Sequence, residues 1–347
     1  MNPAAPAVLA LTLLAGGALA GCAGSGAPAR PSRGAAGPAP ATGAPTGRTG
    51  GQAAAQAGKA APSAGCGRQA AASTGRHSFG GRSYLLTLPQ GGDRTPAPLI
   101  VDLHGLRSNG FQQALYGRLA NAGPARGFVV AEPEGGPGRR GWRLPGMADG
   151  AADIAYVAAL LDHLERTLCV DRRGEFAAGF SNGAGLSAAL VCGLPGRLAG
   201  IAPVAGLNLA RPCAGARPAT IVAFHGTTDP IVPYGGGEPF GGDRRQVPDW
   251  MRPLSGSFAL PPVAALAGRW ARTFGCRATA RDAPGPSVAH LARTGCRGGA
   301  RVELYSVTGG GHTWPGSLPI GLGTTTGQID ATRLILDAFS RTRAVGR

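Results

Sequence analysis

From Cys66 onward, the sequence alternates continuous apolar runs with segments of helical periodicity. The apolar runs, each long enough for a buried strand, are SYLLTLP, PLIVDLHG, GFVVAEPEG, GEFAAGF, GIAPVAG, ATIVAFHG and RVELYSV. Strands that are apolar on both faces and alternate with helices form a mostly parallel sheet with helices on both sides. We therefore expect an α/β fold of this architecture, with SYLLTLP as an edge strand.

The clearest helical pattern in the chain follows Asp149, which we expect to cap the helix. Its apolar residues recur at spacings of three and four and so share one face. They are Ile154, Val157, Leu161, Leu164 and Leu168. Further helices are expected at 111–121, 182–190 and 262–274, and in a last segment with Ile329, Leu336 and Phe339 facing inward.

The first 65 residues differ in composition from the rest of the chain. Between Ala23 and Gly65 there is no Val, Ile, Leu, Met, Phe, Trp or Tyr. Such a segment has too little apolar surface to offset the entropy of ordering it. We therefore predict a disordered tether over 22–65 and one folded domain over 66–347.

The chain begins with an apolar run, APAVLALTLLAGGALAGC, that is too short to span a membrane comfortably. It has the character of a secretory signal peptide, which we place at 1–21. Its end, LAGC, resembles a bacterial lipobox, in which the cysteine is acylated. These features predict export and a lipid anchor at Cys22 on the outer face of the bacterial cell membrane. A secreted product of a plain signal peptide is the alternative.

The net charge of +16 comes almost entirely from arginine, since Lys59 is the only lysine. The arginines are scattered and lack the interleaved aromatic residues of a single-strand binding groove. We therefore expect a solvated basic surface and no nucleic-acid partner.

The cysteines agree with export. Of the 7 cysteines, an even number remains once Cys22 is set aside, which predicts disulfides in an oxidising compartment. The residues alone leave their pairing open. No C-x-x-C spacing occurs and the histidines do not cluster with the cysteines, so we expect no metal site.

The segment GFSNGAGLS, residues 179–187, places Ser181 in the pattern G-x-S-x-G. In a chain with 60 glycines this pattern alone has little weight. Its position carries the inference, because Ser181 lies between an apolar strand and a helix, the setting of a nucleophile elbow. Gly179 and Gly183 would remove side chains that clash with neighbouring backbone at such a turn. We therefore predict that Ser181 is a nucleophile.

A serine nucleophile needs a base and an acid that orients the base. His312, in GGGHTWPG, follows the last strand, and Asp229, in HGTTDPIVPY, follows another strand closely. The order Ser181, Asp229, His312 is that of the α/β-hydrolases. Of the other histidines, we expect His77 and His163 on the surface, His290 in a loop, and His104 and His225 in structural roles. The other candidate acids are expected in loops; they are Asp243, Asp249 and Asp282.

The strand PLIVDLHG ends where an α/β-hydrolase places part of its oxyanion hole. The backbone N–H of Gly105 or Leu106, together with that of Asn182, would stabilise the negative charge that develops on a substrate carbonyl.

Four segments, PLIVDLHG, GFSNGAG, HGTTDPIVPY and GGGHTWPG, resemble the polyhydroxybutyrate depolymerase and feruloyl esterase group of α/β-hydrolases. The resemblance covers about residues 65–340 and implies an α/β-hydrolase catalytic domain with the triad Ser181, Asp229 and His312. It also implies disulfides Cys66–Cys169, Cys192–Cys213 and Cys276–Cys296. A separate polymer-binding domain after the catalytic domain is not expected, which argues against attack on crystalline polyester.

We therefore predict a serine-dependent carboxylic ester hydrolase that needs no cofactor or metal and works as a monomer. Its substrates would be short-chain, hydroxyalkanoate-oligomer, or feruloyl and acetyl esters. An inactive surface binding lipoprotein and an acyltransferase on the same fold are the alternatives. Trp142, Trp250 and Trp314 are candidate substrate contacts, with buried packing roles as the alternative, and the long loop from Tyr234 to Pro262 is expected to cover the site.

Overall fold

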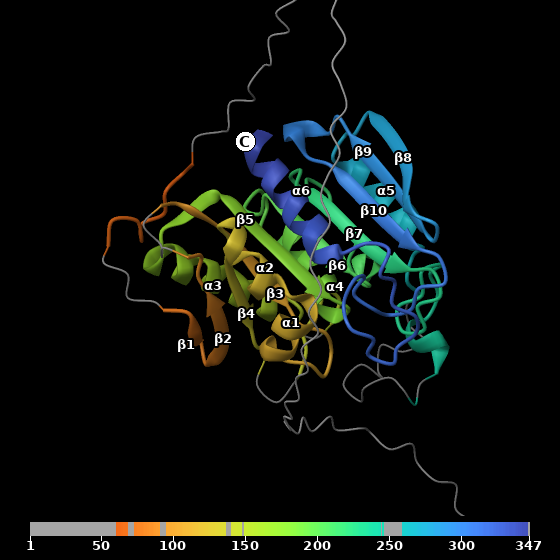
Figure 1. Cartoon of the computed structure of the whole chain (residues 1–347), viewed down its shortest axis with the longest axis horizontal. Helices are drawn as coiled ribbons and strands as arrows, with labels where there is room; N and C mark the ends of the chain where they lie inside the picture. The colour runs from red at the N-terminus through yellow and green to blue at the C-terminus, as the bar shows by residue number, and fades with distance from the viewer. Residues whose placement is uncertain are drawn as a thin grey trace, which may run out of the picture. The chain divides into compact units, whose positions relative to one another are not determined.

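The computed structural model describes residues 60–68, 73–90, 95–136, 140–147, 149–243, 245 and 259–345. Its strands form one 10-stranded sheet in the order β1-β2-β4-β3-β5-β6-β7-β10-β9-β8 (Figure 1). The strands are β1 Gly75–Phe79, β2 Arg82–Thr87, β3 Ala97–Leu103, β4 Val129–Pro133, β5 Val170–Phe180, β6 Gly200–Val204, β7 Thr220–Gly226, β8 Ala278–Gly285, β9 Val288–Thr294 and β10 Val302–Val307. The α-helices are α1 Gly110–Gly117, α2 Leu119–Ala122, α3 Ala152–Thr167, α4 Asn182–Gly193, α5 Val263–Thr273 and α6 Ala331–Val345.

The middle of the sheet is parallel, as the apolar runs predicted. Strands β4, β3, β5, β6, β7 and β10 pair in parallel, and the strands outside them pair antiparallel. Because the carboxyl ends of parallel strands meet at one edge, the residues that follow β3, β5, β7 and β10 are brought together there. The predicted α/β class is confirmed.

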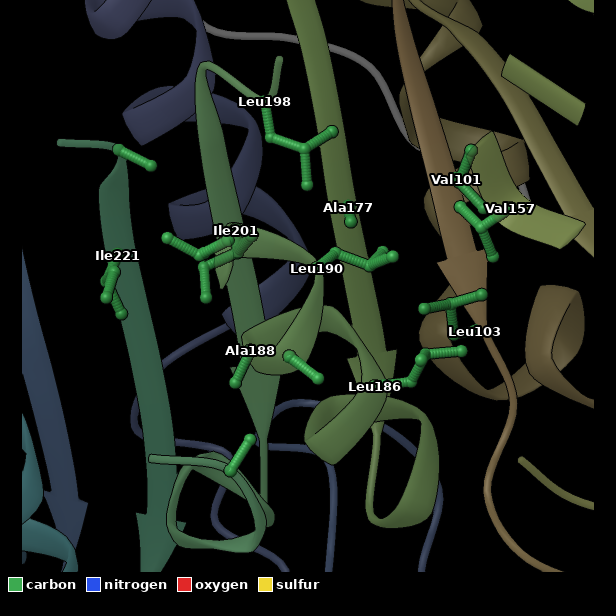
Figure 2. Close-up of a cluster of buried hydrophobic side chains, with 14 of the residues drawn as sticks. Val101, Leu103, Val157, Ala177, Leu186, Ala188, Leu190, Leu198, Ile201 and Ile221 are labelled. Carbon is green, nitrogen blue, oxygen red and sulfur yellow. The ribbon is translucent and has the colours of Figure 1, made fainter. Parts of the chain in front are cut away.

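Helices cover the two faces of this sheet. One buried cluster contains Val157 of α3, Leu186 of α4 and Trp270 of α5, together with apolar residues of the strands. Figure 2 shows part of it, with α4 side chains lying over strands β5 and β6. A second cluster contains Leu119 of α2 and Phe339 of α6. Burial of these side chains is the main stabilisation of the sheet.

The two flanks of the sheet differ from the prediction. SYLLTLP forms β2, which has neighbours on both sides, so the edge strand is β1. The hairpin β8–β9 was expected as a loop, and it places both Asp282 and His290 in strands. Strand β1 alternates half-buried and exposed residues, and β8 is exposed almost throughout. These strands lack the apolar residues by which the inner strands are recognised.

Two helices also depart from their predicted ends. The first helical segment is split into α1 and α2 at Arg118, whose φ of 56° is left-handed. Helix α3 begins after Ala151, and no side chain caps it. Asp149 instead forms an ion pair with Arg143, and the carboxylate of Asp153 in the first turn is buried against Arg82 at 2.6 Å.

The folded domain begins earlier than predicted. The tether was expected to reach Gly65, but Ser63 Oγ donates to Leu168 O at 2.7 Å and Gly65 N donates to Glu165 O at 2.8 Å. Residues 60–65 therefore pack against α3 and the strand that follows it. The predicted signal peptide at 1–21, Cys22 and most of the tether lie outside the described residues.

The structure forms the disulfides Cys66–Cys169, Cys192–Cys213 and Cys276–Cys296, the pairing that the resemblance implied. The first joins residues 103 positions apart and fastens the start of the domain to the end of α3. Disulfides of this kind persist outside the reducing cytosol. Within the described ranges, no helix has the length and apolarity needed to cross a membrane.

Candidate active site

Ser181 occupies a strained turn between β5 and α4. Its φ of 55° and ψ of −117° lie outside the regions that L-residues favour. A Cβ on Gly183 would lie 2.0 Å from Leu103 O, and one on Gly179 would lie 2.5 Å from the Gly183 carbonyl carbon. The two glycines therefore allow the close backbone approach that the sequence pattern suggested. Strain of this kind persists where the surrounding structure enforces it, and it is common at functional sites.

The carboxylate of Asp229 lies just beyond β7 and is buried. Its Oδ1 accepts hydrogen bonds from the amides of Ile231 and Val232, each at 2.8 Å. Its Oδ2 accepts from His312 Nδ1 at 2.7 Å and lies 3.2 Å from His225 Nε2. Burial alone would raise the pKa of Asp229, but hydrogen bonds from the two histidines outweigh it and hold this pKa well below its usual range.

The loop that carries His312 is joined to the loop that carries Asp229. Thr228 donates to Gly310 O through both its amide and its hydroxyl, at 3.0 and 2.9 Å. A Cβ on Gly226 would lie 2.2 Å from the same oxygen, so glycine is required at this contact. The consecutive glycines before His312 thus let the chain turn closely over the end of β7.

The His312 ring also lies beside the elbow. Its centroid is 4.8 Å from that of Phe180, the residue before Ser181. Among the described residues no hydrogen bond joins Ser181 Oγ to His312. Hydrogen bonds between catalytic groups are often long in structures without substrate. The structure therefore brings Asp229 and His312 into direct contact and places both beside the turn that carries Ser181.

His225 contacts the site, although the sequence predicted only a structural role for it. Its Nε2 faces two acceptors, Val232 O at 2.8 Å and Asp229 Oδ2, so Nε2 carries the hydrogen. Asp229 is therefore held by two histidines rather than one. The spacing of four residues between His225 and Asp229, which places both at the end of one strand, is the sequence signal that could have indicated the contact.

The end of β3 lies against the elbow, where the oxyanion hole was predicted. A Cβ on Gly105 would lie 3.5 Å from Ser181 Cβ. Within the part of the chain that the structure describes, the amides of Leu106 and Asn182 donate to no other group. Both remain available to a substrate oxygen.

The tryptophan predictions are corrected by burial. The side chains of Trp142 and Trp314 are both 0% exposed, so neither offers a surface to substrate. The Trp314 indole donates to Thr332 Oγ1 at 3.0 Å, and the Trp142 indole donates to His104 O at 2.8 Å. Both are packing residues, the alternative that the sequence left open. Trp250 and much of the loop from Tyr234 to Pro262 lie outside the described residues.

The described residues contain no group of three or more His, Cys, Asp or Glu side chains that could hold a metal ion. A mostly parallel sheet with an elbow serine after β5, an acid after β7 and a histidine after β10 defines an α/β-hydrolase.

Comparison with known proteins shows which α/β-hydrolases this chain is similar to. The family described as Esterase PHB depolymerase matches residues 82–232, a segment that includes Ser181 and Asp229. Feruloyl esterase B of Piromyces equi is 29% identical over 67% of this chain and 42% of its own length. Feruloyl esterase C of Emericella nidulans is 28% identical over 72% of this chain and 82% of its own length.

A solved structure supports the fold independently. The acetyl xylan esterase of Aspergillus awamori superposes with a TM-score of 0.52, at 14% identity, over 78% of this chain and 98% of its own. The chain is therefore a carboxylic ester hydrolase with an α/β-hydrolase fold, and it is similar to the polyhydroxybutyrate depolymerases and feruloyl esterases.

Proposed function

We propose that Ser181, His312 and Asp229 form a catalytic triad that hydrolyses carboxylic esters through an acyl-enzyme. Ser181 Oγ attacks the ester carbonyl carbon while His312 Nε2 takes the serine proton. The oxyanion accepts hydrogen bonds from the amides of Leu106 and Asn182. The alcohol leaves with the proton from His312, and water then releases the acid by the same steps.

The observation that carries this proposal is the buried contact between His312 Nδ1 and Asp229 Oδ2 beside the strained elbow. Because Nδ1 donates to the carboxylate, Nε2 of the neutral ring has the lone pair that a base requires. Asp229 stays ionised at neutral pH and stabilises the imidazolium that forms.

We propose short-chain, hydroxyalkanoate-oligomer, or feruloyl and acetyl esters as the substrates. The names of the related enzymes support feruloyl and acetyl esters, and the family that matches residues 82–232 supports hydroxyalkanoate oligomers. Acyl transfer to a sugar or glycerol acceptor would use the same residues. An inactive binding lipoprotein is disfavoured because the acid–histidine pair is intact.

A fluorophosphonate probe tests the nucleophile. We expect the wild-type protein to be labelled and Ser181→Ala to be neither labelled nor active. Absence of labelling in the folded wild-type protein would support the binding lipoprotein instead. A screen of the three ester classes, with product analysis in the presence of glycerol, then identifies the substrate and separates hydrolysis from acyl transfer.

We further propose that residues 1–21 direct export and that Cys22 carries the lipid anchor, with the segment up to Ala60 as the tether. The three disulfides support an oxidising location. Incorporation of labelled palmitate that disappears in Cys22→Ser is the expected result. Release of the wild-type protein into the medium without label would favour the plain signal peptide. Light scattering of the purified domain would test the expected monomer.

A further inference from the structure

The two peptide units at the end of β3 are each held by a buried side chain. The carbonyl of His104 accepts from the Trp142 indole N–H at 2.8 Å. The carbonyl of Gly105 accepts from His104 Nδ1 at 2.8 Å. His104 and Trp142 are both 0% exposed, and their ring centroids are 4.9 Å apart.

These contacts set the direction of the oxyanion amides. In a planar trans peptide the C=O of one residue and the N–H of the next point in opposite directions. A bond to the carbonyl of His104 therefore aims the amide of Gly105, and a bond to the carbonyl of Gly105 aims the amide of Leu106. Neither amide can rotate without breaking a buried hydrogen bond.

The protonation of His104 is fixed by its second ring nitrogen. Nε2 accepts from the amide of Gly135 at 3.0 Å, so the hydrogen lies on Nδ1, where Gly105 O requires it. Burial lowers the pKa of His104 and keeps the ring neutral. The imidazole thus acts as a fixed donor and acceptor and takes no part in proton transfer.

Trp142 is also tied to the helix that carries the other oxyanion amide. Its backbone amide donates to Asn182 Oδ1 at 2.6 Å, and its carbonyl accepts from Asn182 Nδ2 at 3.0 Å. A Cβ on Gly141 would lie 2.7 Å from Leu106 Cδ1 and 3.0 Å from Asn182 Oδ1. One residue therefore bridges the two backbone segments, after β3 and at the start of α4, that supply the oxyanion donors.

We propose that His104, Trp142 and Asn182 are positioning residues that hold the Leu106 and Asn182 amides at a fixed separation for the oxyanion. The inference rests on the proposed function. None of the three side chains transfers a proton or contacts the Asp229–His312 pair, so their contribution is to the geometry of the transition state.

Trp142→Phe removes the indole N–H and keeps an aromatic ring. In the full chain we expect kcat to fall about 10- to 100-fold with KM changed less than about 2-fold, since loss of one oxyanion donor outright costs ~10²–10³. The Ki of a trifluoromethyl ketone, which forms a tetrahedral oxyanion on Ser181, should rise by the same factor as kcat/KM falls. The acid limb of the pH–rate profile should not move.

Trp270→Phe is the matched control. Trp270 is equally buried, in α5, and its indole nitrogen has no partner in the described part of the chain. It should lose thermal stability and retain kcat. A Trp142→Phe enzyme with the kcat of this control, or with an unchanged ketone Ki, overturns the proposal.

His104 supplies a second test that does not depend on Trp142. An asparagine amide can replace ring Nδ1 and keep the bond to Gly105 O, whereas a glutamine reaches only the Nε2 position. We expect His104→Asn to retain most of kcat and His104→Gln to lose it, and equal kcat values would contradict the proposal. Activity that survives in Ser181→Ala would instead refute the proposed triad, so the two failures are distinguishable.

Discussion

His312 and His290 both contact carboxylates, but they use their ring nitrogens differently. His312 Nδ1 is bonded to Asp229, and no described residue binds its Nε2. His290 Nδ1 is bonded to Asp282 Oδ1 at 3.0 Å, and its Nε2 lies 3.3 Å from Glu303 Oε2. The ring of His290 is also stacked on Tyr305 at a centroid distance of 4.1 Å.

The difference separates the proposed base, His312, from a histidine in a structural ion pair, His290. Burial alone would lower the pKa of His290, but Glu303 and Asp282 outweigh it and raise this pKa, so the ring is stabilised as a cation. Both ring nitrogens of His290 face carboxylate oxygens, so neither is positioned to take a proton from a substrate or a serine. A histidine next to an acid is therefore a candidate base only when its second nitrogen is left for the reaction.

Replacement of the two histidines gives the largest expected contrast. His312→Ala should lower kcat about 10⁴–10⁶-fold, as the loss of a triad base does, because Ser181 then has no proton acceptor. His290→Ala should change kcat less than about 2-fold, because the His290 ring contacts Asp282, Glu303 and Tyr305 and no residue of the proposed triad. Initial rates on a chromogenic short-chain ester measure both. Comparable losses in the two folded variants would refute the distinction.

Replacement of Asp229 and of Asp282 should give a similar contrast in kcat, with a smaller loss than replacement of His312. Asp229→Asn should lower kcat about 10⁴-fold, because the amide can stabilise the wrong tautomer of His312 and cannot stabilise its cation. Asp282→Asn is the control, since its carboxylate is largely exposed and contacts His290. It should retain activity. A fully active Asp229→Asn enzyme would exclude Asp229 as the orienting acid.

The sequence predicted those parts of the site that directly follow buried parallel strands. Ser181, Asp229 and His312 were predicted as the triad because each comes just after an apolar run, and such runs can be recognised without tertiary information. The outer hairpin β8–β9 could not be found in this way, because β8 is exposed and has no apolar alternation.

Contacts between segments that are far apart in the sequence could not be predicted either. Trp142 was a candidate substrate contact because its ring could offer a flat apolar surface to a substrate. Its burial depends on Asn182, 40 residues further along the chain, and on the carbonyl of His104. Nothing local in the sequence indicates that this loop folds onto the elbow.

A comparison of Glu132 with Asp229 tests whether hydrogen-bond donors, rather than burial, decide whether a buried carboxyl group is ionised. Glu132 is buried beside Asp102, and neither of its carboxyl oxygens has a partner among the described residues. Burial, reinforced by Asp102, raises its pKa to about 9. The folded state therefore binds a proton that the unfolded chain releases above about pH 4.5, and stability falls as pH rises from there to about 9.

Glu132→Gln should remove this dependence. We expect the unfolding free energy of the variant to rise relative to that of the wild type as pH increases from 5 to 9, because a neutral amide needs no proton there. Urea denaturation at several pH values measures the change. Parallel pH profiles for the two proteins would show that Glu132 is ionised in the folded state, against the expectation from burial.

His290→Gln provides the smallest and most specific test of the comparison. The folded-state pKa of His290 is raised, so its contribution to stability is fully present below the unfolded pKa of about 6.5 and is lost as pH rises through the folded value. The variant should be less stable than wild type by about 1 kcal/mol at pH 5.5, with a difference that shrinks toward pH 9. Thermal or urea unfolding measures this difference.

His163→Gln is a control with the opposite sign. Burial lowers the pKa of His163, which stacks on Phe79 at 4.5 Å and has no carboxylate partner in the described residues. The neutral form is favoured in the fold, so the stability lost on its replacement should grow as pH rises through about 6.5. If the stability of the two histidine variants followed the same pH trend, the ion pairs around His290 would not explain how it differs from His163. The contacts of the second ring nitrogen would then not explain why His312 rather than His290 is the proposed base.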